Sequence, residues 1–333
     1  MPSSEPDIPD DTILDYVRRA YGIPAQSATL LPGVSDAQVT AYRIDGDEGP
    51  YFLKLRRDAP PPPLARHLAD AGITGVLAPL SPRDQRRSLH IGERTAILYP
   101  FIDGENAFRR PLQVDQWTAL GAMVRAMHDT TLPPSVIEAM RHETYSEEWC
   151  VLVRGYLTDV RPDGPDDVVA HEMMALLSTN EARIAALAEH AERLGASLRR
   201  RALPMVPCHG DLHAGNVLVD DEGSLTIVDW DDPVLAPRER DLMFVGAGIG
   251  GVWNRPDESD AFYRGYGPIS IDVEALAYYR CERIIEDVVA FGGQLLLDGG
   301  DQGDDRRESL RRFATAFLPN NVVKIAERTF ARL

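Results

Sequence analysis

The chain has 333 residues and a formal net charge of −17, because 52 acidic residues outnumber 35 lysines and arginines. Such an acidic chain repels nucleic-acid phosphates, so nucleic-acid binding is not expected. No apolar run reaches the roughly 18 to 20 residues that span a bilayer, which argues against a membrane protein. The three cysteines lack paired spacing, which fits the cytoplasm better than a disulfide framework or a structural zinc site.

Residues 10–98 carry the patterns of a small, mostly β lobe, preceded by a polar, Pro-rich segment, 1–9, that we expect to be a disordered tail. An aspartate cap (Asp10 or Asp11), helical spacing and a closing glycine predict one helix, and prolines predict the start of a second. Alternating residues around the turn DGDEG predict a hairpin, and two further runs predict two more strands. In chain order the elements are a helix at 10–22, the hairpin within 28–58, a helix within 59–72, and the strands SLHIG and TAILYPF.

Residues 99–104 are predicted to be a hinge, and residues 105–333 a mainly helical lobe. Three long segments of this lobe have apolar residues at helical spacing. They lie at 116–130, 165–200 and 272–297. One β-like stretch, NVLVDDEGSLTIVDW, predicts a hairpin that turns at Glu222 and Gly223. The two parts together predict an α+β fold with two lobes.

The stretch CHGDLHAGNVLVDDEGSLTIVDWDD holds the strongest functional signal. Asp211 and Asn216 are five residues apart, which is the spacing of the aspartate and asparagine in the protein-kinase catalytic loop. Asp229 follows the predicted hairpin, at the place of the metal-binding aspartate of kinases. Phosphoryl transfer needs a carboxylate that orients the attacking alcohol, and Mg²⁺ prefers hard oxygen ligands. The pattern therefore predicts a kinase-like catalytic core.

Two other interpretations of this stretch are weaker. Asp, Gly and Asn also form ordinary turns, but a turn alone does not account for the order of the whole pattern. His209 and His213 are four residues apart, as in zinc-binding helices, but no Glu follows His209 and the nearby glycines disfavour a helix. His209 is expected to support the loop by hydrogen bonding.

Lys54 lies in the apolar strand YFLKLRR and is the candidate for contact with nucleotide phosphates. The simpler alternative is an edge-strand lysine that points into water. Ser35, in LPGVSDAQV, is a candidate for covering the phosphates, although this segment has neither the G-x-G-x-x-G nor the Walker pattern.

HGDLHAGN together with IVDWDD resembles the aminoglycoside phosphotransferase and choline kinase superfamily, and the likeness runs from LPGVSDAQVTAYRI to the C-terminal helices. Two longer strings, DWDDPVLAPRERDLMFVGAGIGGVWN and FYRGYGPISIDVEALAYYRCERIIEDVV, are similar to spectinomycin 9-phosphotransferases. That group transfers the γ-phosphate of ATP to a hydroxyl of spectinomycin and confers resistance. The resemblance implies the protein-kinase-like bilobal fold, a phosphotransferase acting on an alcohol, and ATP with Mg²⁺ as cofactors.

The resemblance also implies a role for each motif residue. Asp211 would be the catalytic base, and Lys54 would hold the α- and β-phosphates. Asn216 and Asp229 would be the Mg²⁺ ligands. The hinge residues that would offer contacts to adenine are Tyr99, Phe101 and Ile102.

The resemblance also draws attention to two further aspartates, Asp241 and Asp70. Asp241, in PRERDLMF, would support the catalytic loop. Family members often pair the strand lysine with a Glu of the first helix, but APPPPLARHLADAG contains no Glu. Either Asp70, the only acid of that segment, approaches Lys54, or the lysine is held otherwise.

The expected substrate is a small cationic alcohol, since spectinomycin carries two methylamino groups that acidic and aromatic residues would suit. The negative charge of the chain fits this substrate and fits simple solubility equally well. Two of the candidate residues, Glu282 and Asp287, are five apart on a predicted helix, so they do not share one face, and one of them could pair with Arg283. By resemblance the candidate substrate residues are Asp231, Trp253, Asn254, Tyr266, Glu282 and Asp287.

Three alternatives remain at this point. The same motif serves kinases of other small alcohols, such as choline, homoserine, a sugar or a biosynthetic intermediate. A nucleotide-binding module without turnover is disfavoured because all the motif residues are present. A protein kinase is disfavoured because the D-F-G and A-P-E signatures are missing. The chain is expected to be a monomer or a homodimer, serving resistance or self-protection within a biosynthetic pathway.

Overall fold

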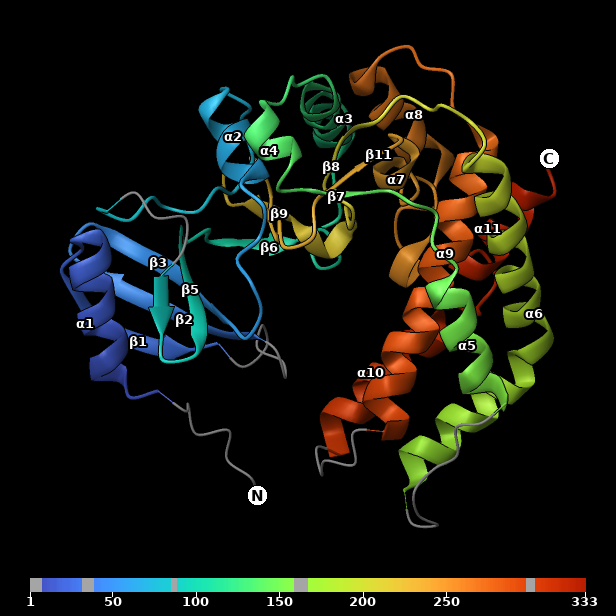
Figure 1. The fold of residues 1–333 in the computed structure, drawn as a ribbon, viewed down its shortest axis with the longest axis horizontal. Helices are drawn as coiled ribbons and strands as arrows, with labels where there is room; N and C mark the ends of the chain where they lie inside the picture. The colour runs from blue at the N-terminus through green and yellow to red at the C-terminus, as the bar shows by residue number, and fades with distance from the viewer. Residues whose placement is uncertain (1–7, 32–38, 85–88, 159–166, 298–302) are drawn as a thin grey trace. The chain divides into compact units, whose positions relative to one another are not determined.

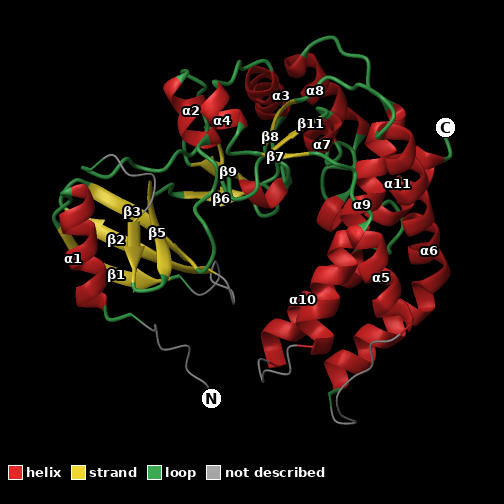
Figure 2. Ribbon diagram, in the orientation of Figure 1, coloured by secondary structure: helices red, strands yellow, loops and turns green. Residues whose placement is uncertain are grey.

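The computed structural model of the chain describes residues 8–31, 39–84, 89–158, 167–297 and 303–333 (Figures 1 and 2). The chain divides into two compact units. The first comprises Met1–Asn106, Thr130–Arg141 and Asn216–Pro233, and the second comprises Ala107–Asp129, His142–Gly215 and Val234–Leu333. Residues 1–7 of the predicted tail lie outside the described residues.

The first unit is built on a five-stranded antiparallel sheet with the strand order β1-β2-β3-β5-β4. Helix α1 (Asp10–Tyr21) packs against the sheet through Ile13, Leu14 and Val17. It ends at Gly22, whose φ of 74° lies in the left-handed region that glycine adopts easily. The strands are β1 (Ala25–Leu30), β2 (Val39–Gly46), β3 (Gly49–Arg56), β4 (Leu89–Ile91) and β5 (Arg94–Pro100).

The predicted elements of this region are confirmed, with two differences at helix starts. The N-cap of α1 is Pro9, while Asp10 and Asp11 lie in the first turn, where a negative charge also favours the helix. Helix α2 (Leu64–Asp70) begins only after the four prolines, because proline lacks the backbone N–H that a helix interior needs.

A second, three-stranded sheet belongs to the same unit and has the order β10-β9-β6. Its strands are β6 (Gly104–Asn106), β9 (Val217–Asp220) and β10 (Leu225–Ile227), and the hairpin turns at Gly223 as predicted. The backbone of Ile227 also bonds to Gly75 and Leu77, at 2.7 and 3.0 Å. These bonds join the hairpin to the first unit, although in the sequence it lies within residues 105–333, the predicted helical lobe. Helix α4 (Pro134–Ile137) belongs here as well, and the two-residue strand β7 (Arg141–His142) lies where the chain passes to the second unit.

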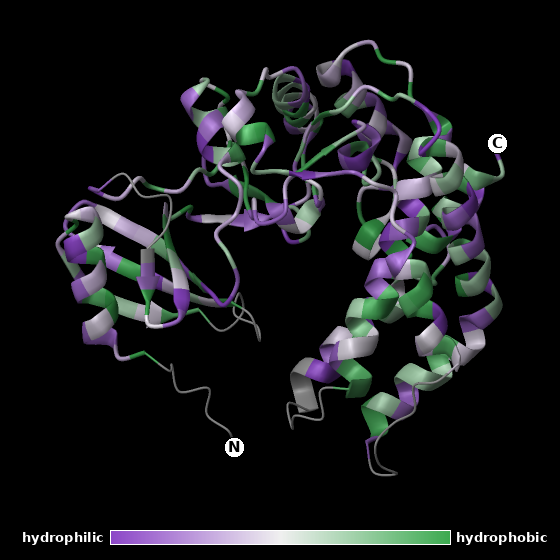
Figure 3. Ribbon diagram, viewed as in Figure 1, coloured by the Kyte–Doolittle hydropathy of each residue, from purple (hydrophilic) through white to green (hydrophobic). Residues whose placement is uncertain are grey.

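The second unit is mainly helical, as the sequence predicted. Its long helices α6 (Val168–Leu198) and α9 (Val273–Gly292) carry both hydrophobic and hydrophilic residues, as amphipathic helices do (Figure 3). Helix α9 also contacts α5 (Glu148–Thr158) and α11 (Val322–Phe330). The remaining helices are α3 (Val114–His128), α7 (Glu239–Leu242), α8 (Pro256–Tyr266) and α10 (Gly303–Thr315).

Glycines bring α3 and α8 close together. A Cβ at Gly121 would collide with the Phe262 carbonyl, and one at Gly265 would collide with the Thr118 carbonyl. Strands β8 (Val206–Cys208) and β11 (Val234–Ala236) pair antiparallel beside these helices and introduce the His209 loop and α7. None of the described helices is long and apolar enough to cross a membrane.

Candidate active site

Lys54 lies on β3, which is flanked by β2 and β5 and is therefore a central strand rather than an edge strand. Side chains alternate between the two faces of a strand. Leu53 and Leu55 join the core shared with α1, so Lys54 and Arg56 face the other side of the sheet. The Lys54 side chain is only 10% exposed, and a buried lysine of this kind needs a carboxylate partner.

Lys54 has two such partners, and neither comes from helix α2. Its Nζ lies 2.6 Å from Asp229 Oδ1 and 2.6 Å from Asp231 Oδ2. Burial alone would lower the pKa of Lys54, but the two carboxylates outweigh it and raise that pKa, so the side chain is cationic. Asp70 pairs instead with Arg66, at 2.7 Å. Of the two possibilities left open by the sequence, the second is therefore correct: Lys54 is held by carboxylates outside helix α2.

Asp231 connects Lys54 to a second cation on the same strand face. Its Oδ1 lies 2.8 Å from Nη1 of Arg56, whose Nη2 lies 2.5 Å from the Asp58 carboxylate. The side chain of Asp231 is 19% exposed, against 48% for Asp229. Asp231 is thus held between two cations, whereas Asp229 keeps a more accessible carboxylate.

The turn after β10 explains why both aspartates reach the lysine. Asp229 has a φ of 65°, in the left-handed region that aspartate tolerates better than most residues. Trp230 is buried, and its indole Nε1 donates to the Ile227 carbonyl at 3.0 Å. With Trp230 turned inward, the aspartates on either side of it point to Lys54.

Asn216, the second predicted metal ligand, lies in the same unit as Asp229. Its carbonyl accepts a hydrogen bond from the N–H of Val228 at 3.0 Å, so the hairpin brings Asn216 beside the residue that precedes Asp229. The side chains offer an amide oxygen and a carboxylate, which are the hard oxygen donors that Mg²⁺ prefers. The residues present therefore fit a magnesium site.

The predicted hinge residues lie at the end of β5 and directly after it. Tyr99 is buried next to Phe52, with the ring centroids 6.2 Å apart. The N–H of Phe101 donates to the Pro50 carbonyl at 3.3 Å, and Arg43 stacks on its ring at 4.6 Å. Ile102 is partly exposed. Ser35 lies outside the described residues.

In the second unit, Asp241 holds the backbone of the loop that carries Asp211. Its carboxylate accepts the N–H groups of His209 at 2.9 Å and Gly210 at 2.8 Å. The predicted role of Asp241 as a support of this loop is confirmed. Gly210 has a φ of 88°, a conformation that favours glycine.

Three histidine rings form hydrogen bonds around this loop. His128 Nε2 lies 3.0 Å from Asp241 Oδ2 and donates to it, and its Nδ1 lies 2.8 Å from the Tyr266 hydroxyl. His209 Nδ1 accepts the N–H of Asp211 at 3.2 Å, and His213 Nδ1 accepts the N–H of Gly215 at 2.9 Å. The His209 ring thus supports the loop, in line with its predicted role.

Arg240 links the loop to helix α9. It donates from Nε to the Gly210 carbonyl at 3.1 Å and from Nη1 to Glu282 at 2.7 Å. The Tyr278 hydroxyl donates to the other oxygen of Glu282 at 2.6 Å. Burial raises the pKa of Glu282 to about 7, and Arg240 opposes that rise.

Removing Arg240 should destabilise the protein strongly. An Arg240→Ala variant leaves Glu282 buried without its cation, and breaking a buried pair in this way costs about 3–5 kcal/mol. Denaturant unfolding of both proteins measures the difference. Arg255→Ala removes an exposed arginine that pairs with Asp257 and should cost at most about 1 kcal/mol. Equal losses in the two variants would show that the Arg240 pair does not hold the loop.

Asp211 is surrounded by cationic and donor groups. Arg283 Nη1 donates to Asp211 Oδ1 at 2.6 Å, and His213 Nε2 lies 3.4 Å from Oδ2. Burial alone would raise the pKa of Asp211, but Arg283, His213 and His209 outweigh it and hold that pKa well below its ordinary value. Arg283 is itself anchored by Asp287, whose Oδ1 lies 3.0 Å from Nε. Asp211 is therefore an ionised carboxylate at neutral pH.

A comparison of the sequence with models of protein families shows the family of this chain. The model of the phosphotransferase enzyme family APH matches residues 29–283, which is most of the chain. The chain belongs to this family. It is accordingly a phosphotransferase with a hydroxyl group as acceptor, and the interpretation as a module without turnover is not retained.

Solved structures agree with the family. Spectinomycin phosphotransferase APH(9)-Ia, in complex with ADP and spectinomycin, is 37% identical, covering 97% of this chain and 99% of that chain with a TM-score of 0.88. Amicoumacin kinase hAmiN, in complex with AMP-PNP and Ca²⁺, is 18% identical over 96% and 94%, with a TM-score of 0.63. Macrolide 2′-phosphotransferase MphH from Brachybacterium faecium is 17% identical over 93% and 97%, at 0.54. The last two show the shared kinase-like fold alone. No curated protein matches the sequence.

The candidate substrate residues of this APH-family chain fall into two groups. Trp253, Tyr266 and Glu282 are buried with neighbours of their own: the Trp117 ring, the His128 ring and the Arg240 guanidinium, respectively. Asp231 is held by Lys54 and Arg56. Asn254 is exposed, and Asp287 is 22% exposed beside Arg283. Asn254 alone of these six is exposed, whereas Asp287 is about as buried as Asp231 and pairs with Arg283.

The sequence interpretation missed Arg56 and Arg240, and it considered Arg283 only as a partner for Glu282 or Asp287. Arg56 could have been found, because it lies two residues after Lys54 and so shares its strand face. Arg240 has no such local signal, since its partner Glu282 is 42 residues away.

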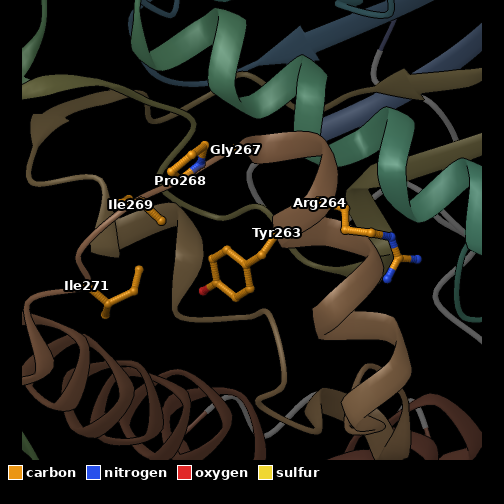
Figure 4. Close-up of a pocket in the computed structure, with 6 residues that line it drawn as sticks. All are labelled: Tyr263, Arg264, Gly267, Pro268, Ile269 and Ile271. Carbon is orange, nitrogen blue, oxygen red and sulfur yellow. The ribbon is translucent and has the colours of Figure 1, made fainter.

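A cavity of about 530 Å³ lies elsewhere in the second unit, at the end of α8 (Figure 4). Its single charged residue, Arg264, points away from the other five. None of the motif residues lines this cavity, so it does not belong to the site described above. The lining residues are Tyr263, Arg264, Gly267, Pro268, Ile269 and Ile271.

Proposed function

We propose that the chain transfers the γ-phosphate of ATP to a hydroxyl of spectinomycin or of a closely related aminocyclitol, and thereby gives resistance to it. The supporting observation is the 37% identity, over nearly the full length of both chains, to an enzyme solved with ADP and spectinomycin. The net charge of −17 favours approach of a cationic substrate of this kind.

On the nucleotide side, Lys54 would bind the α- and β-phosphates of ATP. Its two carboxylates fix the position of Nζ, and binding of phosphate would replace part of this pairing. Asn216 and Asp229 would hold Mg²⁺, which when bound neutralises charge on the phosphate oxygens. Tyr99, Phe101 and Ile102 would contact adenine, and Ser35 remains a proposal for phosphate contact.

On the acceptor side, Asp211 would orient the substrate hydroxyl and accept its proton. The braced backbone of His209 and Gly210 fixes the direction of this carboxylate, and positioning is the main contribution a protein makes to phosphoryl transfer. Asp287 and Asn254 are the proposed contacts for the cationic and polar groups of the substrate.

A substrate panel tests the proposal directly. The purified chain is incubated with ATP, Mg²⁺ and spectinomycin, other aminocyclitols, choline, homoserine or simple sugars, and products are identified by mass spectrometry. We expect ADP and a singly phosphorylated spectinomycin. A product only from choline, homoserine or a sugar would replace the proposed substrate, and no product from any aminocyclitol would refute it.

The role of Asp211 gives a pH prediction. An Arg283→Ala variant removes the cation nearest to Asp211, so the pKa of Asp211 should rise toward its ordinary value. A base works while deprotonated, and activity is lost as the pH falls through its pKa. The acidic limb of kcat/KM should therefore move to higher pH in the variant, while Arg283→Lys keeps a cation and should move less. Identical limbs in wild type and Arg283→Ala would contradict the assignment.

A further inference from the structure

Three arginines converge on a cavity in the second unit that shares only Asn254 with the residues given roles above. The cavity has a volume of about 340 Å³ and lies between helices α9 and α11 and the segments around Gly246 and Asn320. Two of its arginines are exposed: Arg328 lies in the last turn of α11, and Arg332 follows the end of that helix. The third, Arg280, lies on α9. Asn254 and Thr329 supply further polar groups to the lining.

Arg280 is partly buried and held in place by uncharged groups. It donates from Nε to the Met243 carbonyl at 3.0 Å, from Nη2 to the Val245 carbonyl at 2.8 Å, and from Nη1 to the Thr329 hydroxyl at 2.7 Å. A guanidinium has five N–H donors, so two remain for another acceptor. Burial lowers the pKa of Arg280 to about 10, and the neighbouring Arg332 adds to that effect.

Within the described part of the chain, no carboxylate forms an ion pair with Arg280, Arg328 or Arg332, in a protein whose acidic residues outnumber its lysines and arginines by 52 to 35. Other partly buried arginines of this protein have carboxylate partners, as Arg56 and Arg283 do. Of the three, Arg280 is the one partly removed from water, and such a charge is normally paired because an unpaired one is costly.

We propose that this cavity is a binding site for a small phosphate-bearing anion. Arg280 would be its fixed contact, and Arg328 and Arg332 would be two further cationic contacts. The planar guanidinium presents paired N–H donors that match phosphate oxygens. Three cations suit a dianionic group better than a single carboxylate. The volume is in the range of small-molecule sites, so it leaves room for the organic part of a phosphomonoester.

The experiment measures the thermal unfolding temperature of the full chain against rising inorganic phosphate, at constant ionic strength. A ligand that binds only the folded state raises this temperature in a saturable way. We expect saturation in the wild type and at least about tenfold weaker phosphate binding in an Arg328→Ala/Arg332→Ala double variant, since hydrogen bonds to charged groups are among the stronger ones. Arg280 is left intact because it also holds the backbone of Met243 and Val245.

The matched control is Arg311→Ala/Arg312→Ala, which removes two arginines from α10 that are 72% and 74% exposed and pair with Glu308. It loses the same charge and should retain the wild-type response. The site is refuted if both double variants respond alike, or if the wild-type response follows ionic strength without saturating. An equal response to a dicarboxylate would refute the choice of phosphate. None of these readouts depends on which alcohol the enzyme phosphorylates.

Discussion

An Asp211→Asn variant is expected to fold like the wild type and to lose phosphotransfer by about 10²–10⁴-fold in kcat. The amide keeps the shape of the side chain and one oxygen that can accept from Arg283. It lacks the negative charge that draws the hydroxyl proton. The loss should therefore appear in kcat, measured as ADP formation with the phosphorylated substrate, with little change in the denaturation midpoint.

The control for this variant is Asp115→Asn, which changes an exposed aspartate in the first turn of α3. Its kcat and unfolding midpoint should both match the wild type. If Asp211→Asn kept most of its turnover while remaining folded, Asp211 would not be the proton acceptor. If its kcat and stability fell together, the effect would be structural.

The catalytic roles of the motif stay predictions, and they rest on a pattern that is local in the sequence. Asp211 and Asn216 lie on one loop, and a hairpin of short strands separates them from Asp229, so their spacing pointed to a kinase-like core and the resemblance implied a role for each residue. The alternation of β3 likewise suggested Lys54. The same locality explains why the helices and strands of both units were largely predicted: each depends on a pattern within a single segment.

The roles that could not be predicted depend on contacts between distant residues. Asp231 was assigned to the substrate, yet the fold places it on Lys54, 177 residues away in the chain. Tyr266 was assigned to the substrate as well, but its hydroxyl is bound to His128, 138 residues away. A list of acidic and aromatic residues does not show which of them the fold buries with partners of their own, because one sequence carries no information on pairing at such separations.

The two aspartates that hold Lys54 should differ in their effects. Asp229 is proposed to bind Mg²⁺, so Asp229→Asn should lower kcat by about 10²–10³-fold, as removal of a group that stabilises transition-state charge does. Asp231 holds Lys54 and Arg56 without a proposed contact to the metal, so Asp231→Asn should weaken ATP binding by about 10–100-fold through misplacement of the lysine.

Calorimetric titration of ADP with and without Mg²⁺ separates these roles. Asp229→Asn should bind ADP normally in the absence of Mg²⁺ and lose the gain that Mg²⁺ provides, because Lys54 keeps its pairing with Asp231. Asp231→Asn should bind ADP more weakly under both conditions. Asp58→Asn is the matched control: it changes the exposed carboxylate on the far side of Arg56, which pairs with Arg56 and not with Lys54, and it should bind like the wild type. If Asp229→Asn and Asp231→Asn lost the Mg²⁺ effect equally, Asp231 would be a metal ligand as well. Asp231 would then not be a partner reserved for Lys54, in the role that a glutamate of the first helix has in other family members.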